Sequence, residues 1–307
     1  MSPAVTAIVL NWNNAPDTLG CLASLAQQDT THRVLVVDNG STDDSVARIA
    51  AAFPAVVILQ TGANLGYAGG NNAGIRKALQ DDADYLFVLN NDVTLAADCL
   101  SALVDAAQSQ PRVGVVGGIV YDLEAPQRIQ SAGMHLNAIG DSVHRGEGQQ
   151  EAGQFAAVDE VDAVKGCAML VSREAIAAAG VLDERYFMYL EEVDWCQRIR
   201  RAGYAVLFAP AAHIWHPETP LGDDRYVRAT YYMTRNAYLL LRTRRAPLSA
   251  YAWRLARDLM WVANWTVNPK WRHKRRERDA IVYALRDALL GRWGPMGASR
   301  SRSLGLG

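Results

Sequence analysis

The stretch RVLVVDNGSTDD, residues 33–44, decides the fold class of this chain. Four consecutive apolar residues, Val34 to Val37, lead to the acid Asp38 and then to a polar turn that contains Gly40. A strand that is apolar without alternation is buried on both faces, as the strands of parallel sheets are. We therefore predict a parallel sheet with helices on both faces and a polar turn at the carboxyl end of this strand.

The same pattern extends through the first 120 residues, where short apolar segments alternate with helical patterns. The expected strands are 5–10, 33–37, 56–59, 85–89 and 113–116. The expected helices are 17–28, 43–53, 71–80 and 100–108. Such alternation is typical of a doubly wound α/β domain with a mostly parallel sheet.

The rest of the chain is less regular at first and then becomes helical. Residues 121–160 are polar and contain several glycines without a clear period, so we predict a loop-rich segment. A strand at 161–172, a helix at 193–202 and a strand at 204–209 are expected next. Beyond residue 225 the pattern predicts three helices, at 226–245, 249–266 and 274–290.

Charge divides the 307 residues into two regions, although the whole chain has a net charge of only −1. Residues 1–224 contain 13 basic and 28 acidic residues, whereas residues 225–307 contain 18 basic and 4 acidic residues. We predict an α/β domain over 1–224 and a basic helical region over 225–307, with the boundary near Gly222–Asp224. Half of the residues are apolar, which excludes disorder as the main state.

Several protein classes are excluded by what the sequence lacks. No apolar run reaches the roughly 20 residues of a membrane-spanning helix. The first residues have neither a basic segment nor a cleavage site typical of a secretory signal. The four cysteines form no CxxC pair, so we expect free thiols in a reducing cytoplasm rather than disulfides or a zinc site.

Acids stand where two of the predicted strands end. Asp38 follows one strand, and Asn90, Asn91 and Asp92 follow another. Ligands of open parallel sheets bind at these carboxyl ends, so both endings are candidate site residues. The alternative for each ending is ordinary turn chemistry or a helix cap.

Three further segments contain groups suited to chemistry. The Gly-rich run 64–74 leads to a predicted helix start, where backbone N–H groups can hold an anion, or it is simply a tight loop. Glu191, Glu192 and Asp194 lie within four residues, which suits a general base of raised pKa or an acidic first helical turn. His216 follows a strand and is a candidate metal ligand beside Asp92.

Five motifs follow one another in a characteristic order: VVDNGSTD at 36–43, NLGYAGGNNAG at 64–74, LNNDV at 89–93, YLEEVDWCQRIRRAGY at 189–204 and AHIWHP at 212–217. Over about residues 5–245 the chain resembles a family 2 glycosyltransferase of the GT-A fold. It is most similar to the branch of rhamnosyltransferases and galactofuranosyltransferases. Each motif alone is weak, but the set is specific.

The resemblance implies roles for individual residues. Asp38 takes the position of the acid that binds the nucleotide base or ribose. Asp92 takes the position of a ligand of Mg²⁺ or Mn²⁺, with His216 as a second ligand, and Glu192 takes the position of the catalytic base. The donor-binding set implied in this way is Asp38, Asn64, Gly66, Gly70, Asn71, Asn90 and Asn91, together with Lys165 and Gly166 from a segment that resembles the acceptor side of the family's site.

Two positions depart from the family pattern. Asn90 replaces the first acid of the DxD motif, which removes one negative charge from the metal site. The acidic pair before the helix is Glu191–Glu192 rather than Glu–Asp, so the base is one methylene longer. Either Glu192 or Asp194 is therefore open as the base at this point.

These observations predict an inverting glycosyltransferase that moves rhamnose from a nucleotide-diphosphate donor (dTDP-rhamnose, or a UDP-sugar) to a glycan or lipid-linked acceptor in cell-surface polysaccharide synthesis. A sugar-phosphate nucleotidyltransferase is the first alternative, but residues 11–14 lack its Gly-rich basic signature. A non-catalytic sugar-nucleotide-binding protein is the second.

The basic region leaves three interpretations open. Tryptophans stand among its arginines and lysines, which suits peripheral binding to an anionic membrane on its inner face. The alternatives are helices packed on the acidic domain and a nucleic-acid surface. No nucleic-acid motif accompanies the charge, so we expect no nucleic-acid partner.

Overall fold

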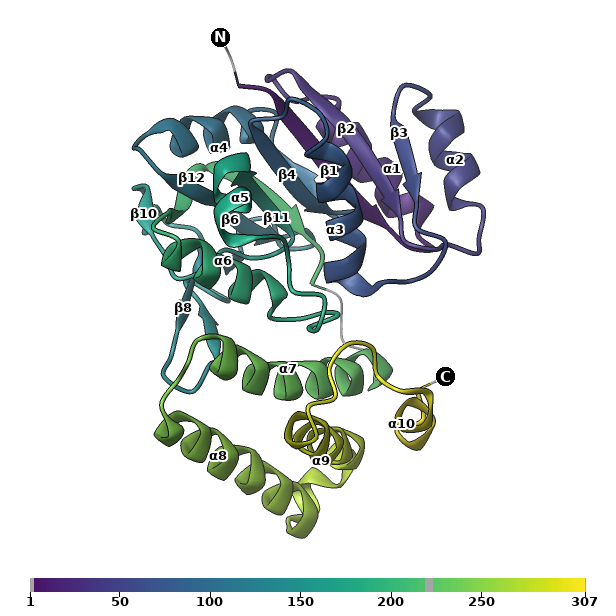
Figure 1. The fold of residues 1–307 in the computed structure, drawn as a ribbon, viewed down its shortest axis with the longest axis vertical. Coiled ribbons are helices and arrows are strands. Elements are labelled where there is room, and N and C mark those ends of the chain that lie inside the picture. The colour runs from purple at the N-terminus through teal and green to yellow at the C-terminus, as the bar shows by residue number, and fades with distance from the viewer. Residues whose placement is uncertain (1–2, 219–222, 307) are drawn as a thin grey trace.

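The computed structural model describes residues 3–218 and 223–306, and Figure 1 shows a sheet with its helices above a layer of C-terminal helices. The main path of the ten-stranded sheet runs in the order β10 (Asp159–Glu160), β12 (Ala205–His216), β6 (Val113–Asp122), β11 (Ala168–Ser172), β4 (Tyr85–Asn90), β1 (Val5–Asn11), β2 (His32–Asp38) and β3 (Val57–Gln60). Two short strands extend it, β5 (Thr94–Leu95) on β12 and β7 (Ile129–Ser131) on β6. A separate hairpin joins β8 (Met134–Leu136) and β9 (Ser142–His144).

The sheet is mixed, with a parallel part that carries the predicted strand ends. β3, β2, β1 and β4 are mutually parallel, and β6 and β12 form a second parallel pair. β11 lies between these two parts and is antiparallel to both β4 and β6. The polar ends of β1, β2 and β4 therefore meet at one edge of the sheet, as the sequence predicts.

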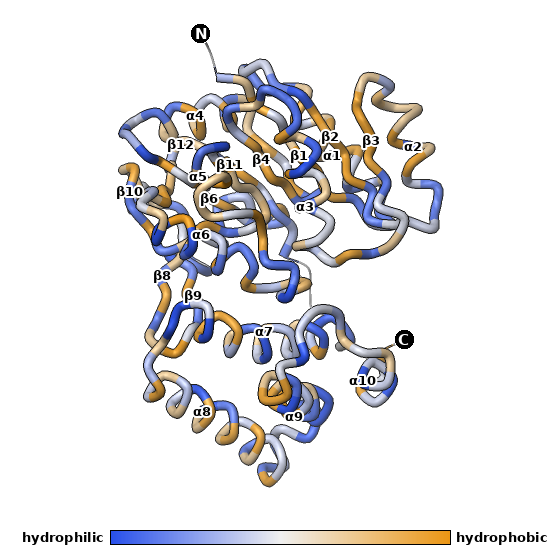
Figure 2. Tube along the Cα trace, in the orientation of Figure 1, coloured by the Kyte–Doolittle hydropathy of each residue, from blue (hydrophilic) through white to orange (hydrophobic). Residues whose placement is uncertain are grey.

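Helices cover both faces of the sheet. The first seven are α1 (Ala15–Leu25), α2 (Ser45–Ala52), α3 (Gly66–Ala78), α4 (Cys99–Gln108), α5 (Arg173–Ala179), α6 (Glu191–Arg201) and α7 (Asp223–Thr243). One face packs Ile8 and Val88 with α3 and α6. The other packs Val9 and Leu89 with α1 and α4. Neighbouring residues of one strand thus enter opposite cores, which explains their unbroken apolar sequence. Figure 2 shows the apolar residues along these strands in orange.

The C-terminal layer consists of helices that reach into the first of these cores. After α7 come α8 (Leu248–Val267), a 3₁₀ turn (Pro269–Lys274), α9 (Arg275–Leu289) and α10 (Ala298–Ser303). Ala237, Leu239 and Leu240 of α7 belong to the same buried cluster as the sheet residues. No helix within the described ranges is long and apolar enough to cross a membrane. The boundary expected near Gly222–Asp224 lies partly outside the described residues.

Three expectations about local structure are wrong. The segment 121–160 is not simply loop, because it contains β7, β8, β9 and β10. The strand expected over 161–172 is confined to β11. Before it, the N–H of Val161 donates to the Val206 carbonyl in β12 and that of Ala163 donates to the Met134 carbonyl in β8, so these residues do not continue the β11 ladder. The strand expected to end at Ala209 continues through a bulge to His216, so His213 and His216 lie within β12 rather than after it.

Candidate active site

Side chains at the ends of β1 and β2 form a buried polar network. Asn11 lies opposite Asp38 in the parallel register, and its amide donates to Asp38 Oδ1 at 2.9 Å and to Ser41 Oγ at 3.1 Å. Asp38 Oδ2 accepts the backbone N–H of Ser41 at 3.1 Å. Asp38 is only 2% exposed, and its hydrogen bonds with Asn11 and Ser41 hold the turn after β2.

The Gly-rich run lies mostly within α3 rather than in a loop before it. Asn64 Oδ1 accepts the N–H of Gly66 at 2.8 Å, next to the helix start. A Cβ on Gly66 would lie 2.5 Å from Phe187, and one on Gly70 would lie 2.6 Å from Leu10. These glycines therefore allow close packing of α3. Asn71 is fully buried, and its Oδ1 has no hydrogen-bond partner among the described residues.

Asp92 lies in the turn after β4 and His216 lies at the end of β12, and their side chains face each other. Asp92 Oδ1 lies 3.3 Å from His216 Nε2, and the Asn90 amide lies 3.4 Å from the same nitrogen. Burial alone would raise the pKa of Asp92, but its contact with His216 reverses the effect and lowers that pKa. Asp92 Oδ1 and His216 Nδ1 are buried without a well-aligned hydrogen bond to any described residue.

Asn91 is not brought into this pair. Its amide donates to Thr18 Oγ1 at 3.0 Å and to the Asn14 carbonyl at 3.3 Å, both at the start of α1. Thr18 in turn donates to Asn11 Oδ1 at 2.7 Å. Asn91 therefore links the turn after β4 to α1 and β1.

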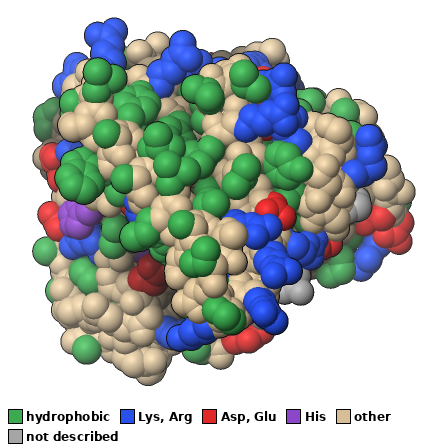
Figure 3. All heavy atoms as spheres, turned by 90° about the horizontal axis from the view of Figure 1, so that it is seen from below, with side chains coloured by type: hydrophobic (Ala, Val, Ile, Leu, Met, Phe, Trp, Pro, Cys, Tyr) green, Lys and Arg blue, Asp and Glu red, His purple; other side chains and the backbone are tan. Residues whose placement is uncertain are grey.

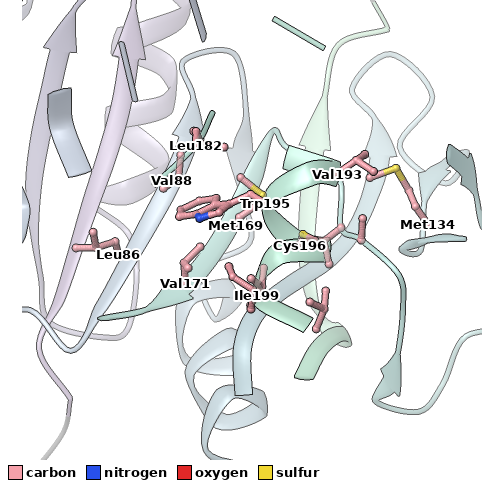
Figure 4. Packing of buried hydrophobic residues seen from close by; sticks show 14 of the residues in the cluster. Leu86, Val88, Met134, Met169, Val171, Leu182, Val193, Trp195, Cys196 and Ile199 are labelled. Carbon is pink, nitrogen blue, oxygen red and sulfur yellow. The ribbon is translucent and has the colours of Figure 1, made fainter. Parts of the chain in front are cut away.

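Two glutamates occupy the first turn of α6. Glu191 is 4% exposed, and burial, then the charge of Glu192, raises its pKa well above the ordinary value. Burial also raises the pKa of Glu192, while nearby backbone N–H groups and Lys165 oppose that rise. Neither Oε2 atom has a hydrogen-bond partner among the described residues. The helix itself is anchored by Trp195, which lies among Val88, Met169 and Leu182 in Figure 4.

Asp194 lies in a different environment from the two glutamates. It is fully buried and its Oδ2 accepts from Arg198 Nε at 2.7 Å. The same guanidinium donates to the carbonyls of Ala179 and Val181. The ion pair therefore joins α6 to the segment after α5, and the structure does not bring Asp194 together with Asp92.

Tyr67 lies where the acidic groups converge, although the sequence analysis did not single it out. Its hydroxyl donates to the Gly166 carbonyl. Burial raises its pKa well above the ordinary value, and the charges of Glu191, Glu192 and Asp92 add to that rise. The hydrogen bond to Gly166 places Tyr67 beside Glu192, and the charges of Glu191 and Asp92 also reach it. The one sequence feature that could have pointed to Tyr67 as a site residue is its position within the Gly-rich run 64–74.

Lys165 and Gly166 lie beside the glutamates. A Cβ on Gly166 would be 3.1 Å from Glu192 Cγ, so the bare backbone makes room for that side chain. Lys165 donates to the Gln130 side chain and lines a cavity of about 290 Å³ together with His144 and His216. Burial, then the charge of Lys165, lowers the pKa of His144 to about 4.

The loop before α6 has an unusual backbone. Phe187, Tyr189 and Leu190 have φ values of 67°, 67° and 69°, a region that residues other than glycine rarely adopt. Asn236 of α7 is fully buried and donates to the carbonyls of Tyr186, Met188 and Tyr189 at 3.0, 2.8 and 2.8 Å. A residue of the C-terminal region therefore holds the loop that leads into Glu191.

A large cleft of about 1040 Å³ opens beside Asp92. Its walls come from the turn after β1, the loop before α6 and the first turns of α7, represented by Asn13, Tyr189, Arg225 and Arg228. The sequence analysis did not identify these two arginines as site residues, because no local motif marks them.

The sequence profile of glycosyl transferase family 2 matches residues 6–178. The chain belongs to this family. It is 29% identical, over 92% of its length and 99% of the relative's, to the N-acetylglucosaminyl-diphospho-decaprenol L-rhamnosyltransferase of Mycobacterium tuberculosis. It is 24% identical, over 81% of its length and 83% of the relative's, to the dTDP-rhamnosyl transferase RfbF of Shigella flexneri. The predicted family and its rhamnosyltransferase branch are confirmed.

Solved structures confirm the GT-A fold of this glycosyltransferase. The mannosyltransferase PcManGT of Pyrobaculum calidifontis, in complex with GDP-Man and Mn²⁺, matches 95% of this chain and 88% of its own, with a TM-score of 0.56 and 17% identity. GalNAc-T7 with UDP, GalNAc and Mn²⁺ matches 77% of this chain and 51% of its own, with a TM-score of 0.57 and 14% identity.

Proposed function

We propose that this glycosyltransferase moves rhamnose from dTDP-rhamnose to a hydroxyl of a lipid-linked or glycan acceptor in cell-surface polysaccharide synthesis, with inversion at the anomeric carbon. The observation that carries the proposal is geometric: Asp92 lies 3.3 Å from His216, and Glu192 lies against Gly166, whose carbonyl accepts from the Tyr67 hydroxyl. A group suited to a metal and a group suited to a base thus both lie near enough to Tyr67 for their charges to raise its pKa. The two rhamnosyltransferases among its relatives support rhamnose as the transferred sugar.

Glu192 is the proposed base. The acceptor hydroxyl has a pKa far above 7 and must lose its proton as it attacks, which a positioned carboxylate accomplishes. Glu192 is more exposed than Glu191 and lies against Gly166, beside the cavity lined by Lys165. A carboxylate whose pKa is raised accepts a proton more readily, and a single base acting in an in-line displacement inverts the anomeric centre.

Asp92 and His216 fit a divalent cation that is completed by the substrate. They present an oxygen and a nitrogen 3.3 Å apart, and the buried Asp92 Oδ1 has no aligned hydrogen bond within the described ranges. Among the described residues, no group of three or more His, Cys, Asp or Glu is arranged to hold a metal ion by itself, so phosphate oxygens and water would supply the remaining ligands. Bound Mg²⁺ or Mn²⁺ would neutralise charge on the departing diphosphate.

The underside of the C-terminal layer fits an anionic membrane surface, where a lipid-linked acceptor would be presented. Trp253, Met260 and Leu289 are 71%, 61% and 87% exposed. An apolar cavity of about 600 Å³ lies between α7, α8 and α9. Figure 3 shows hydrophobic side chains gathered on this face, with Lys and Arg at its edge. Apolar surface with a basic rim is typical of peripheral membrane binding.

The experiment that tests the activity is a panel of nucleotide sugars, each incubated with Mg²⁺ or Mn²⁺ and scored for release of nucleoside diphosphate. We expect dTDP-rhamnose to give the fastest release, and addition of chelator to abolish it. A sugar-nucleotide-binding protein without catalysis would bind donors but release no diphosphate. Faster turnover of another donor would replace rhamnose in the proposal.

A further inference from the structure

We propose that Arg225 and Arg228, in the first two turns of α7, form an anion site for the diphosphate of the donor. Both side chains line the cleft that also contains Asp92. The inference rests on the proposed function, since it names the part of the substrate that these residues bind. It assigns part of the donor site to the C-terminal region.

The two arginines are held next to the loop that precedes α6. Arg225, Arg228, Tyr232 and Arg235 recur at intervals of three and four, which places them along one side of α7. Tyr232 stacks on Phe187 of that loop with ring centroids 5.6 Å apart. Arg235 is 1% exposed and donates to the Tyr186 carbonyl at 3.1 Å. These contacts fix the direction in which the first turns of α7 face.

Tyr189 lines the same cleft as Arg225 and Arg228, and the charges of both arginines reach it. Burial raises the pKa of this phenol, and the charges of Arg225 and Arg228 oppose the rise. Tyr189 and Met188 line the same cleft as the two arginines. The positive charges therefore lie at its wall.

Neither arginine is neutralised by another described residue. Arg225 and Arg228 form no side-chain hydrogen bond or ion pair to a residue whose side chain the structure describes, in the ranges 3–218 and 224–306, whereas other arginines of this region do. Arg254 and Arg257 pair with Asp141 and Asp258, Arg276 pairs with Asp224, and Arg300 pairs with Asp287. The positive charge of Arg225 and Arg228 thus remains available for a ligand.

Several acids that share the cleft already have partners. Asp92 faces His216, Glu218 pairs with Arg128, and Asp224 pairs with Arg276. Of the other two, Asp17 accepts from Asn14 and Glu124 is exposed. A polyanion entering the cleft is therefore opposed mainly by Asp17 and Glu124, and attracted by two unpaired guanidinium groups.

A diphosphate is the ligand that these groups suit. Guanidinium groups donate pairs of parallel hydrogen bonds to phosphate oxygens and keep their charge at any working pH. The bond between the sugar and the diphosphate breaks during transfer, and its electrons remain on the diphosphate, which gains negative charge. Cations that are already in place stabilise that charge without reorganisation.

Isothermal titration of nucleoside diphosphates tests the assignment. The probes are dTDP, UDP and GDP with Mg²⁺, each compared with its nucleoside. The Arg225→Gln/Arg228→Gln double variant should bind the preferred diphosphate at least about tenfold more weakly, because hydrogen bonds to charged groups are lost. Affinity for the nucleoside should not change. Thermal melts of each variant would confirm that it is folded.

The matched control removes two charges elsewhere. Arg33 lies at the opposite end of β2 from Asp38, and Arg302 lies on α10; both are exposed. Arg33→Gln/Arg302→Gln should bind diphosphate as the wild type does. Unchanged binding by the Arg225/Arg228 variant, or an equal loss in the control, would overturn the anion site while leaving the proposed function in place. If the wild type binds none of the diphosphates, both proposals fail.

Discussion

The acidic sheet domain and the basic C-terminal helices use their charged residues in opposite ways. In the sheet domain, one carboxylate oxygen of each of Asp92, Glu191 and Glu192 is buried at a strand or helix end without a hydrogen-bond partner among the described residues. In the helices, Arg235 and Arg254 are 1% and 4% exposed, yet each has several partners. Unsatisfied buried acids are typical of a site, whereas satisfied buried arginines are typical of a joint between elements.

The difference shows that the net positive charge of residues 225–307 is not simply a surface for a partner. Arg254 and Arg257 bond Asp141, which lies before β9, and Arg276 bonds Asp224 and the carbonyls of Leu304 and Gly305. Part of the charge therefore holds the C-terminal layer together and to the hairpin. These contacts agree with the packing interpretation of the sequence, whereas the membrane interpretation stays a prediction.

The largest expected effect is at the metal pair. Asp92→Ala should abolish transfer while the fold is retained, because the carboxylate that faces His216 is lost. The measurement is diphosphate release in Mg²⁺ and in Mn²⁺, with circular dichroism as the check on folding. Asp105→Ala, on the exposed face of α4, is the matched control and should remain active. Normal turnover by the Asp92 variant would remove the metal role from this residue.

The next effect distinguishes the two candidate bases. Glu192→Gln is nearly isosteric and should lower kcat at least ~10²-fold while the Kd for the donor is unchanged. Asp194→Asn should instead lower the free energy of unfolding by about 3 kcal/mol, because it breaks a buried ion pair. The exposed Glu174→Gln on α5 is the control for both. If Asp194→Asn were stable but inactive, the base would be Asp194.

The dependence of the site on the C-terminal region can be tested at Asn236. Asn236→Ala leaves three buried carbonyls of the loop before α6 without their donor, at a cost on the order of 2–4 kcal/mol in the free energy of unfolding. We also expect kcat to fall in the folded variant, because the loop directs Glu191 and Glu192. Asn264→Ala on exposed α8 should change stability by less than about 0.5 kcal/mol. An active, stable Asn236 variant would contradict this coupling.

The buried glutamate pair predicts a pH dependence of stability. Glu191 has a raised pKa in the folded protein, so the folded state holds its proton at pH values where the unfolded state has lost it. The contribution of Glu191 to the free energy of unfolding is therefore largest below the ordinary glutamate pKa. It is lost as the pH rises from there through the raised pKa of the folded state. Glu191→Gln should therefore be more stable than the wild type at neutral pH, and the difference should vanish in acid. Denaturant titrations at several pH values measure the free energy of unfolding of the wild type and of the variant.

The smallest effect on catalysis is expected at the outer basic residues. Lys270, Arg272 and Arg275 are exposed and have no acid within ion-pair distance among the described residues, unlike Lys274 and Arg276. Changing all three to Gln should weaken the free energy of binding to anionic vesicles, measured by co-sedimentation, by ~1 kcal/mol per residue. Turnover of a soluble acceptor should not change.

The vesicle experiment has two internal controls. Binding should fall at high salt, because the Debye length is only ~3 Å at 1 M. Charge-matched substitution of Arg33, Arg48 and Lys77 on the sheet domain should not alter binding. Equal sedimentation with neutral and anionic vesicles, or none with either, would leave packing as the role of the basic residues.

The sequence alone determined the α/β fold class and located most residues of the candidate site. Unbroken apolar runs such as 34–37 require burial on two faces, and polar residues at the ends of parallel strands lie at one edge, so Asp38 and Asn90 share that edge on either side of β1. The acidic pair and His216 could be found because their motifs are local. The helices α7, α8 and α9 were also predicted, because their periodicity is local too, whereas the short α10 was not.

Only the tertiary structure decided which of these groups face one another. It separated Asp194, paired with Arg198, from Glu192, although the two residues lie within one helical turn. It placed Tyr67 beside the carboxylates, and it brought Asn236 and Arg225 to the site from about 45 and 35 residues beyond the acidic cluster. No local pattern marks such contacts, because the packing of α7 against the loop before α6 arises only when distant segments fold together.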